Sequence, residues 1–230
     1  MGRYVWILTK KDYKEIFTNP VQLLIVMGYL IFFNIIPLIS IVFREVSSVE
    51  ITIFSVGLSA IFPVLNVLVE GVSKEQKNRV LDLLLTKISP LTICINKLVT
   101  SISMSVIFAI FSLFFQLIIN KLFFPDILNI LYYLLDKNLL VITFQMVLPV
   151  ILLTSSLGLI ISIFLDTNIR MYGLAVLLLI IFGSIRLLLA NGINILTGEF
   201  QWLSIVLWLM FFLSLFAIYF CVDKEKMLKS

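Results

Sequence analysis

The sequence contains no histidine and only two cysteines, and these shortages exclude several kinds of site. Histidine is the side chain that most often serves as a general base or a metal ligand near neutral pH. Cys94 and Cys221 are too few and too widely separated for a zinc cluster or a disulfide framework. The chain also lacks the GxxxxGK[ST] sequence with which P-loop proteins bind phosphates. We therefore expect no catalytic site on this chain, and no ATP hydrolysis.

Charge is also scarce, since only 13% of the 230 residues are charged whereas 61% are hydrophobic. Soluble domains are about 25% charged and about 45–50% apolar. A soluble chain of this length could not bury so much apolar surface, so the composition indicates a membrane protein with several spans. It excludes a soluble enzyme and a nucleic-acid-binding protein.

Six apolar runs are each long enough to cross a bilayer, which takes about 20 helical residues. They lie at 21–43, 51–69, 98–119, 139–165, 171–190 and 202–222. None contains an acidic residue, and only the fifth contains a basic one, Arg186. No strand-like alternation is present, so we predict an all-α polytopic membrane protein with six transmembrane helices in one domain, 21–222.

The lysines and arginines outside these runs predict the orientation of the chain. If the N-terminus is cytoplasmic, thirteen of them lie on the cytoplasmic side and three, Arg44, Lys121 and Lys137, lie outside. This asymmetry predicts that both termini are cytoplasmic, with 223–230 as a short cytoplasmic tail. The lipid bilayer is then the first partner of the chain.

Residues 1–20 predict an amphipathic helix on the inner membrane surface. Apolar and aromatic side chains recur at helical spacing, and the lysines point elsewhere. The recurring residues are Trp6, Thr9, Tyr13, Ile16 and Phe17. Asn19-Pro20 then ends this helix before the first span, because the residue before a proline disfavours helical geometry.

The largest predicted cytoplasmic loop, 71–97, has the most informative pattern. Residues from Lys74 to Thr86 predict one short helix that is charged at its start and leucine-rich afterwards. Ser89-Pro90 predicts the start of a new helix, with serine as the cap and proline in the first position. An exposed leucine face needs a cover, which could be the membrane, the rest of the chain or a partner.

This loop resembles the first cytoplasmic loop of type-two ABC export permeases, which reads roughly E-x-E-x-G-T-L-E-x-L-L-x-T-P-x-S before a lysine opens the third span. The matching residues are Glu75, Leu81, Asp82, Leu84, Thr86, Ser89, Pro90 and Lys97. Lys77 and Arg79 stand where that family usually has glutamate and glycine, and Val80 replaces threonine. The six runs and the Asn19-Pro20 junction agree with the resemblance.

The resemblance implies a fold and a set of partners. The loop would be a coupling helix that docks on a separate ATP-binding subunit, which would hold the ATP and magnesium, so that no cofactor is expected on this chain. The residues expected to make this contact are Glu75, Leu81, Asp82, Leu84, Leu85, Thr86, Ser89 and Pro90. A second permease subunit, identical or homologous, would complete the pathway in a bacterial plasma membrane.

The predicted spans contain neutral polar groups and much phenylalanine, which favours a hydrophobic or amphipathic cargo over an ion. A peptide such as a bacteriocin, an antimicrobial or a lipid-like compound would fit. Candidate cargo contacts are Asn34, Asn66, Ser105, Gln116, Gln145 and Arg186. These amides could equally hold helices together, and Arg186 could reach the outer headgroups. A haem-export-related permease and a membrane sensor or scaffold that transports nothing are the alternative functions.

Overall fold

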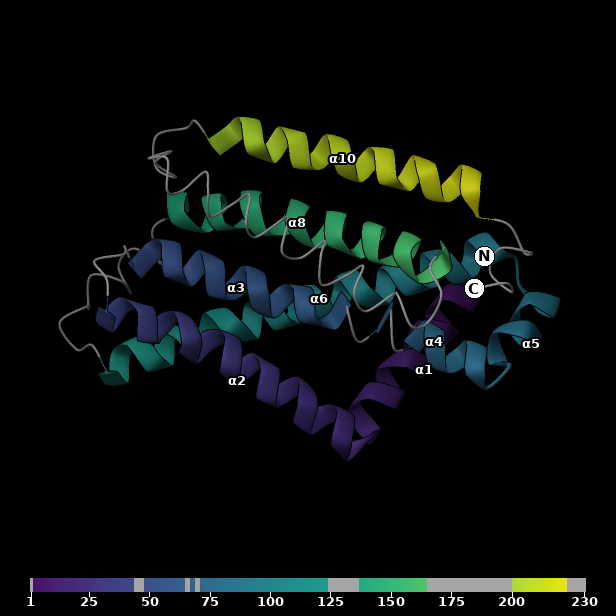
Figure 1. Cartoon of the computed structure of the whole chain (residues 1–230), viewed down its shortest axis with the longest axis horizontal. Coiled ribbons are helices and arrows are strands. Elements are labelled where there is room, and N and C mark those ends of the chain that lie inside the picture. Colours follow the sequence, from purple (N-terminus) through teal and green to yellow (C-terminus); the bar gives the residue numbers. More distant parts are fainter. Residues whose placement is uncertain are drawn as a thin grey trace.

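The computed structural model of the chain describes residues 2–43, 48–64, 67–68, 71–123, 137–164 and 200–222, and every element within these ranges is helical. Figure 1 shows the elements along the chain. They are α1 (Gly2–Thr18), α2 (Pro20–Phe43), α3 (Ser48–Val64), α4 (Gly71–Lys77), α5 (Val80–Lys87), α6 (Pro90–Phe123), α8 (Lys137–Phe164) and α10 (Phe200–Cys221). The all-α prediction is confirmed for this described part of the chain.

Three of these helices are long and apolar enough to cross a membrane, over Pro90–Gln116, Val147–Phe164 and Trp202–Phe220. The number becomes four if α1 and α2 together form one bent span. The predicted runs 21–43 and 51–69 fall largely on α2 and α3, whereas the run 171–190 and the tail 223–230 lie outside the described residues. The described helices therefore fit an all-α membrane protein, and six spans stay a prediction.

The predicted break at Asn19-Pro20 is confirmed. α1 ends at Thr18, α2 begins at Pro20, and their axes meet at 79°, which forms the V at the bottom of Figure 1. Proline suits the first position of a helix because the backbone N–H that it lacks has no partner there. The Asn19 side chain accepts a hydrogen bond from the backbone N–H of Val21 at 3.1 Å, which stabilises the start of α2.

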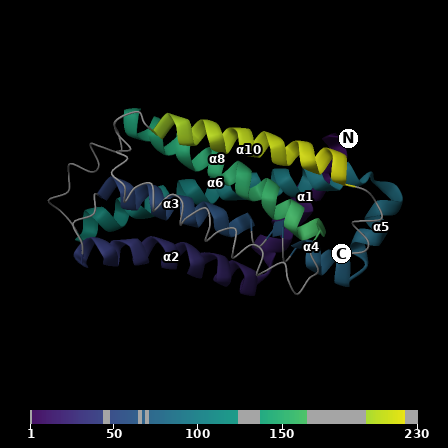
Figure 2. The ribbon, with the colours of Figure 1, turned by 45° about the horizontal axis from the view of Figure 1, so that its top comes forward.

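The long helices α2, α3, α6, α8 and α10 run alongside one another, as Figures 1 and 2 show from two directions. α3 packs against α2, α6 and α8, and α10 packs against α8. The short helices α1, α4 and α5 gather at one end of this bundle, on the right in Figure 1. The apolar core runs through to that end, because Leu81 and Leu85 of α5 belong to the same buried cluster as Val64, Ile93 and Met104.

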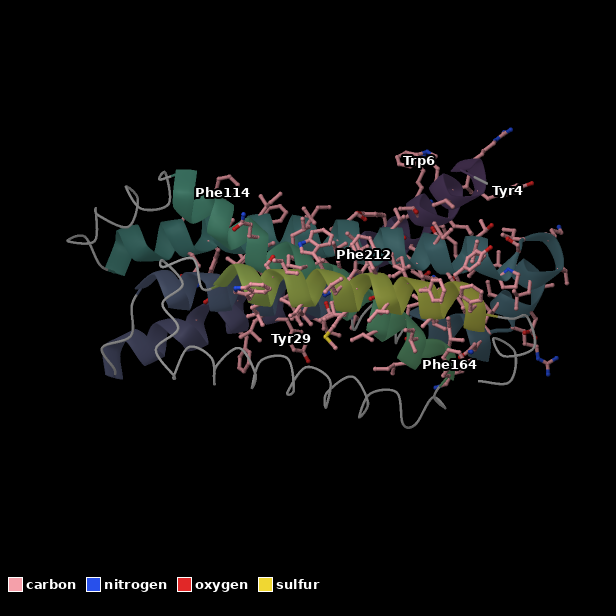
Figure 3. All side chains as sticks on the ribbon, turned by 90° about the horizontal axis from the view of Figure 1, so that it is seen from above. Tyr4, Trp6, Tyr29, Phe114, Phe164 and Phe212 are labelled. Carbon is pink, nitrogen blue, oxygen red and sulfur yellow. The ribbon has the colours of Figure 1, made fainter. Side chains whose placement is uncertain are left out.

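The outer surface of the bundle is rich in large apolar side chains. Figure 3 labels six aromatic residues at or near this surface, among them Trp6 on α1, Phe114 on α6 and Phe212 on α10, all of them exposed. A soluble monomer rarely exposes a continuous apolar surface of this kind. The surface is therefore suited to lipid hydrocarbon, in agreement with the composition.

The loop between α3 and α6 differs from its prediction in one respect. Instead of one helix from Lys74 to Thr86, the chain forms α4 and α5, separated by a turn at Asn78 and Arg79. Arg79 has φ = 54°, which is the only positive φ among the described residues other than glycine. A left-handed residue cannot continue a right-handed helix, so the helix must restart at Val80.

The predicted helix start at Ser89-Pro90 is confirmed. Ile88 is extended, and α6 begins at Pro90. The Thr92 backbone N–H donates to the Ser89 carbonyl at 3.0 Å and lies 3.4 Å from the Ser89 hydroxyl, which caps the helix. This proline and its cap separate α5 sharply from α6, so α5 stands apart from the long helix that follows it.

Candidate functional site

The leucine face of α5 is covered by the rest of the chain, which is one of the three covers that the sequence left open. Leu81 and Leu85 are buried in the chain's own core, and Leu84 is half-buried against the same cluster. Residues four apart lie on one face of a helix, which explains why Leu81 and Leu85 are buried together. Leu83 lies on the other side and is 69% exposed. Among these leucines, Leu83 is the one that can contact a partner in this conformation.

The other predicted contact residues of the loop fall into two groups. Asp82, Thr86 and Ser89 are exposed, and Pro90 is half-buried. Glu75 is buried, so it is not part of the exposed surface. We use the name outer edge of α5 for Asp82, Leu83 and Thr86, which is the surface that this short helix offers.

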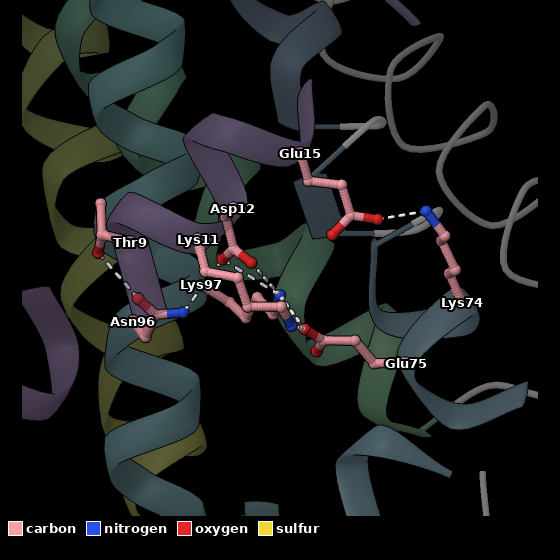
Figure 4. Close-up of polar contacts among 8 residues, drawn as sticks. All are labelled: Thr9, Lys11, Asp12, Glu15, Lys74, Glu75, Asn96 and Lys97. Carbon is pink, nitrogen blue, oxygen red and sulfur yellow. Dashed lines mark hydrogen bonds and ion pairs between the residues drawn. The ribbon is translucent and has the colours of Figure 1, made fainter. Parts of the chain in front are cut away.

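Glu75 on α4 is held by lysines from two other helices. Its Oε1 lies 3.1 Å from Lys97 Nζ on α6 and 2.9 Å from Lys11 Nζ on α1. Figure 4 shows these contacts, with Glu75 on the right and Lys97 reaching it from the left. The side chain of Lys97 is only 4% exposed, so this ion pair is buried. A single carboxylate thus joins three separate elements.

Asp12 on α1 is the second carboxylate beside Lys97. Both oxygens of Asp12 lie 3.2 Å from Lys97 Nζ. The Asn96 side-chain amide donates to Asp12 Oδ2 at 3.1 Å, and the Thr9 hydroxyl donates to Asn96 Oδ1 at 2.8 Å. Buried charges persist only where partners and hydrogen bonds offset their desolvation, and these contacts provide both. We call Thr9, Lys11, Asp12, Glu75, Asn96 and Lys97 the ion cluster.

The two carboxyls of the ion cluster differ in their pKa. Burial raises the pKa of Glu75, but the charge of Lys97 and the hydrogen bond from Lys11 outweigh burial, so the net pKa lies below its ordinary value. Burial also raises the pKa of Asp12, and here it outweighs Lys97, so the net pKa lies above its ordinary value. Burial lowers the pKa of Lys11, but Glu75 more than reverses this and the net pKa is raised. Glu75 is therefore the more firmly ionised of the two carboxyls.

A second ion pair joins α1 to α4 at the surface, where Lys74 pairs with Glu15. Both of these side chains are exposed, so water and salt weaken the pair and its net contribution is small.

A hydrogen bond joins α1 to α6, since the Tyr13 hydroxyl on α1 donates to Ser103 on α6 at 2.7 Å. Of the side chains predicted to share the apolar face of α1, Thr9, Tyr13 and Ile16 pack toward the chain, whereas Trp6 and Phe17 are exposed.

Two of the candidate cargo contacts, Asn34 and Gln116, bond to each other inside the bundle. Gln116 Nε2 donates to Asn34 Oδ1 at 3.0 Å, and the Ser112 hydroxyl donates to the same oxygen at 2.7 Å. Asn34 Nδ2 donates to the Leu30 carbonyl at 2.7 Å and to Ser59 on α3 at 3.2 Å. All four polar side chains are fully buried, so they join α2, α3 and α6 in this conformation.

Of the remaining candidates, Ser105 and Gln145 do not join that group. Ser105 is buried and its hydroxyl has no hydrogen-bond partner within the described part of the chain, whereas Gln145 on α8 is exposed. Asn66 and Arg186 lie outside the described residues. Within the described ranges no three His, Cys, Asp or Glu side chains gather as metal ligands would.

The ion cluster contains residues that the sequence pattern did not single out, above all Asp12 and Asn96. One signal was present, because Leu8, Thr9, Asp12 and Ile16 recur at helical spacing and all four are buried. A carboxylate on the apolar face of a helix is unusual unless it has a partner. Lys97 within the apolar start of α6 is the matching unusual residue.

Comparisons of the chain with protein-family models, with curated proteins and with solved structures found no match.

Proposed function

We propose that this chain is the membrane subunit of a type-two ABC exporter, with six spans and both termini in the cytoplasm. An ATP-binding subunit would dock on the outer edge of α5 and would hold the ATP and magnesium. The observation that carries the proposal is that the loop helices are anchored to the bundle while Leu83 remains exposed. Docking and anchoring are the two properties that a coupling element needs.

The anchoring supports the proposal on physical grounds. Leu81 and Leu85 fix α5 to the apolar core, and Glu75 fixes α4 to α1 and α6. A force applied to a rigidly attached helix reaches the elements it contacts, whereas a flexible loop would absorb it. A scaffold that transports nothing would not require this attachment.

The turn at Arg79 gives further support. The loop of the resembled family has glycine at this position, and glycine adopts a positive φ without strain. Here the position has φ = 54° although the residue is arginine. The backbone therefore has the geometry that would favour glycine, even though the residue differs.

We infer that the cargo is a hydrophobic or amphipathic compound, such as a peptide, an antimicrobial or a lipid-like molecule. The apolar walls of α6, α8 and α10 suit such a compound, and no acidic residue occurs in a predicted span to hold a naked ion. Asn34 and Gln116 could contact the cargo only if the helices separate, because their side chains are buried together. A second permease subunit would form the other half of the pathway.

The test is to purify the tagged chain from its native membrane and to identify copurifying ATP-binding proteins by mass spectrometry. We expect one whose sequence contains GxxxxGK[ST], and we expect the Leu83→Asp variant to lose most of it. Placing a charge in an apolar contact costs several kcal/mol when no partner offsets it, enough to release a modest interface.

Two variants serve as controls. Leu83→Ala, which only shortens the side chain, should retain part of the ATP-binding protein, and Lys77→Asp, an exposed charge change on α4, should retain most of it. The proposal is wrong if no ATP-binding protein accompanies the wild-type chain, or if Leu83→Asp retains it in full.

A further inference from the structure

Glu75 on α4 contacts a lysine on α1 and a lysine on α6, so its side chain lies where these three helices meet. α4 is only seven residues long, and a helix of this length is not stable alone in water. Its buried side chains include Val72 and Glu75, and Glu75 contacts lysines on α1 and α6. The Glu75 carboxylate is therefore a main polar attachment of the loop to the bundle.

The way in which Glu75 is bound also leaves it room to change partners. Its two lysines both contact Oε1, whereas the buried Oε2 has no hydrogen-bond partner among the residues that the structure describes. A buried carboxylate oxygen without a donor is unfavourable, so a donor brought within reach of Oε2 would be favoured. A small displacement of α4 could pass one lysine to Oε2 while the other stays on Oε1.

Lys97 extends this connection, because it holds Glu75 and Asp12 at the same time. A shift of Glu75 away from Lys97 would leave the lysine to Asp12 alone, and a shift toward it would weaken the Asp12 contact. The position of α4 and the attachment of α1 to α6 thus depend on one shared cation.

We infer that Glu75 is the positioning residue through which a displacement of the loop helices reaches α1 and α6 together. This inference rests on the proposed function for its purpose, and on the ion cluster for its geometry. To bridge Lys11 and Lys97, the side chain at position 75 must be long enough to reach both lysines and must also carry a negative charge. Glu75→Gln removes the charge, and Glu75→Asp keeps the charge but shortens the side chain by one methylene.

The first experiment uses the purified chain alone and does not depend on an ATP-binding partner. Hydrogen–deuterium exchange of the α1 backbone should rise about tenfold in Glu75→Gln and nearly as much in Glu75→Asp, because α1 loses its bridge to the loop. The matched control is Glu15→Gln, which removes the exposed carboxylate that joins the same two helices and should change exchange less than about twofold.

The outcomes separate the possible roles of Glu75. If Glu75→Asp exchanges like the wild type, charge alone suffices and the bridging role is refuted. If neither variant changes exchange in α1, Glu75 does not connect the loop to α1 and the inference is refuted as well. A rise in exchange that is confined to α4 would also refute the inference.

The second experiment uses the chain with its ATP-binding subunit in proteoliposomes. Both Glu75 variants should keep that subunit and its basal ATP hydrolysis, while the stimulation of hydrolysis by a hydrophobic peptide falls at least tenfold. Equal loss of basal and stimulated hydrolysis would mean that Glu75 only stabilises the complex, and would refute the positioning role. If no ATP-binding subunit is found, the proposed function fails, and the exchange result still decides whether Glu75 bridges the helices.

Discussion

At the scale of single residues, two carboxylates share Lys97 but interact with it unequally. The pKa of Glu75 is lowered, whereas that of Asp12 is raised by its burial. The ionised form of Glu75 is therefore stabilised by folding, and the ionised form of Asp12 is not. Removing the charge should be more harmful at Glu75 than at Asp12.

We predict that Glu75→Gln lowers the melting temperature of the purified chain at pH 7 more than Asp12→Asn does. Removing one partner from a buried pair costs on the order of 3 kcal/mol, because the other charges stay buried. Asp12→Asn should cost less, since a neutral side chain avoids the desolvation that raises the pKa of Asp12. Thermal unfolding in detergent measures both, and the reverse order would contradict this account of the cluster.

The dependence on pH follows from the lowered pKa of Glu75. A group whose pKa is lower in the folded state contributes stability above its ordinary value, here 4.5, and this contribution is lost as the pH falls through the folded pKa. The difference in melting temperature between wild type and Glu75→Gln should be constant from pH 7 to about pH 5 and should narrow below pH 4.5. A difference that widens in acid would show that Glu75 is not held ionised.

Arg79 gives a second prediction at this scale, because a side chain at a positive φ is strained. The left-handed conformation costs roughly 1–2 kcal/mol for a residue with a Cβ atom, which exceeds the entropic cost of about 0.5–1 kcal/mol for glycine. We therefore expect Arg79→Gly to raise the melting temperature by a few degrees. Lys77→Gly, within α4, should lower it, and an equal effect at both positions would refute a strained turn.

At the scale of elements, α5 shows how one short helix serves two surfaces. Leu81 fills the core, and Leu83 lies on the outer edge. We predict that Leu81→Ala destabilises the chain by about 2–5 kcal/mol, because it leaves a cavity. Leu83→Ala should change stability by less than about 0.5 kcal/mol. Thermal unfolding of the two variants measures this, and equal losses would mean that Leu83 is also packed within the chain.

Two of the helix boundaries could be predicted because a proline follows a capping residue there. Asn19-Pro20 and Ser89-Pro90 are each a boundary in the structure, because proline suits the first turn of a helix and disfavours helix before it. The turn at Arg79 could not be predicted in this way, since asparagine and arginine are both tolerated inside helices. Tertiary contacts of Leu81 and Glu75 accompany the turn, and these are not visible in local sequence.

The sequence predicts which helices have an apolar face more readily than it predicts what covers that face. The leucines of α5 predicted an apolar surface, but sequence alone did not tell whether the cover was a partner or the chain itself. The ion cluster joins residues 84 to 85 positions apart, Asp12 with Asn96 and Lys97, and such pairs leave no periodic signal. These residues come together because α1 packs against α6.

At the scale of the whole molecule, the described helices form a bundle with α1, α4 and α5 gathered at one end. The asymmetry of lysine and arginine predicts that this end faces the cytoplasm. We expect a cysteine that replaces Lys87 or Lys229 to be protected from an impermeant thiol reagent in intact cells, whereas one that replaces Lys137 is labelled.

The same variants in inverted vesicles provide the control for this topology. The cysteine at position 87 should then be labelled and the one at position 137 protected. All of these variants carry serine in place of Cys94 and Cys221. Labelling at position 229 but not at position 137 in intact cells would overturn the orientation, and with it the cytoplasmic position of the loop.

We propose that the outer edge of α5 contacts an ATP-binding subunit, and site-specific photo-crosslinking in native membranes tests this contact most directly. A photoreactive amino acid at position 83 is compared with one at position 209, where the native leucine is also exposed but lies on the apolar helix α10. We predict a crosslinked product that contains an ATP-binding protein at position 83 and none at position 209. The absence of such a product at position 83, or the same product at both positions, would contradict the account.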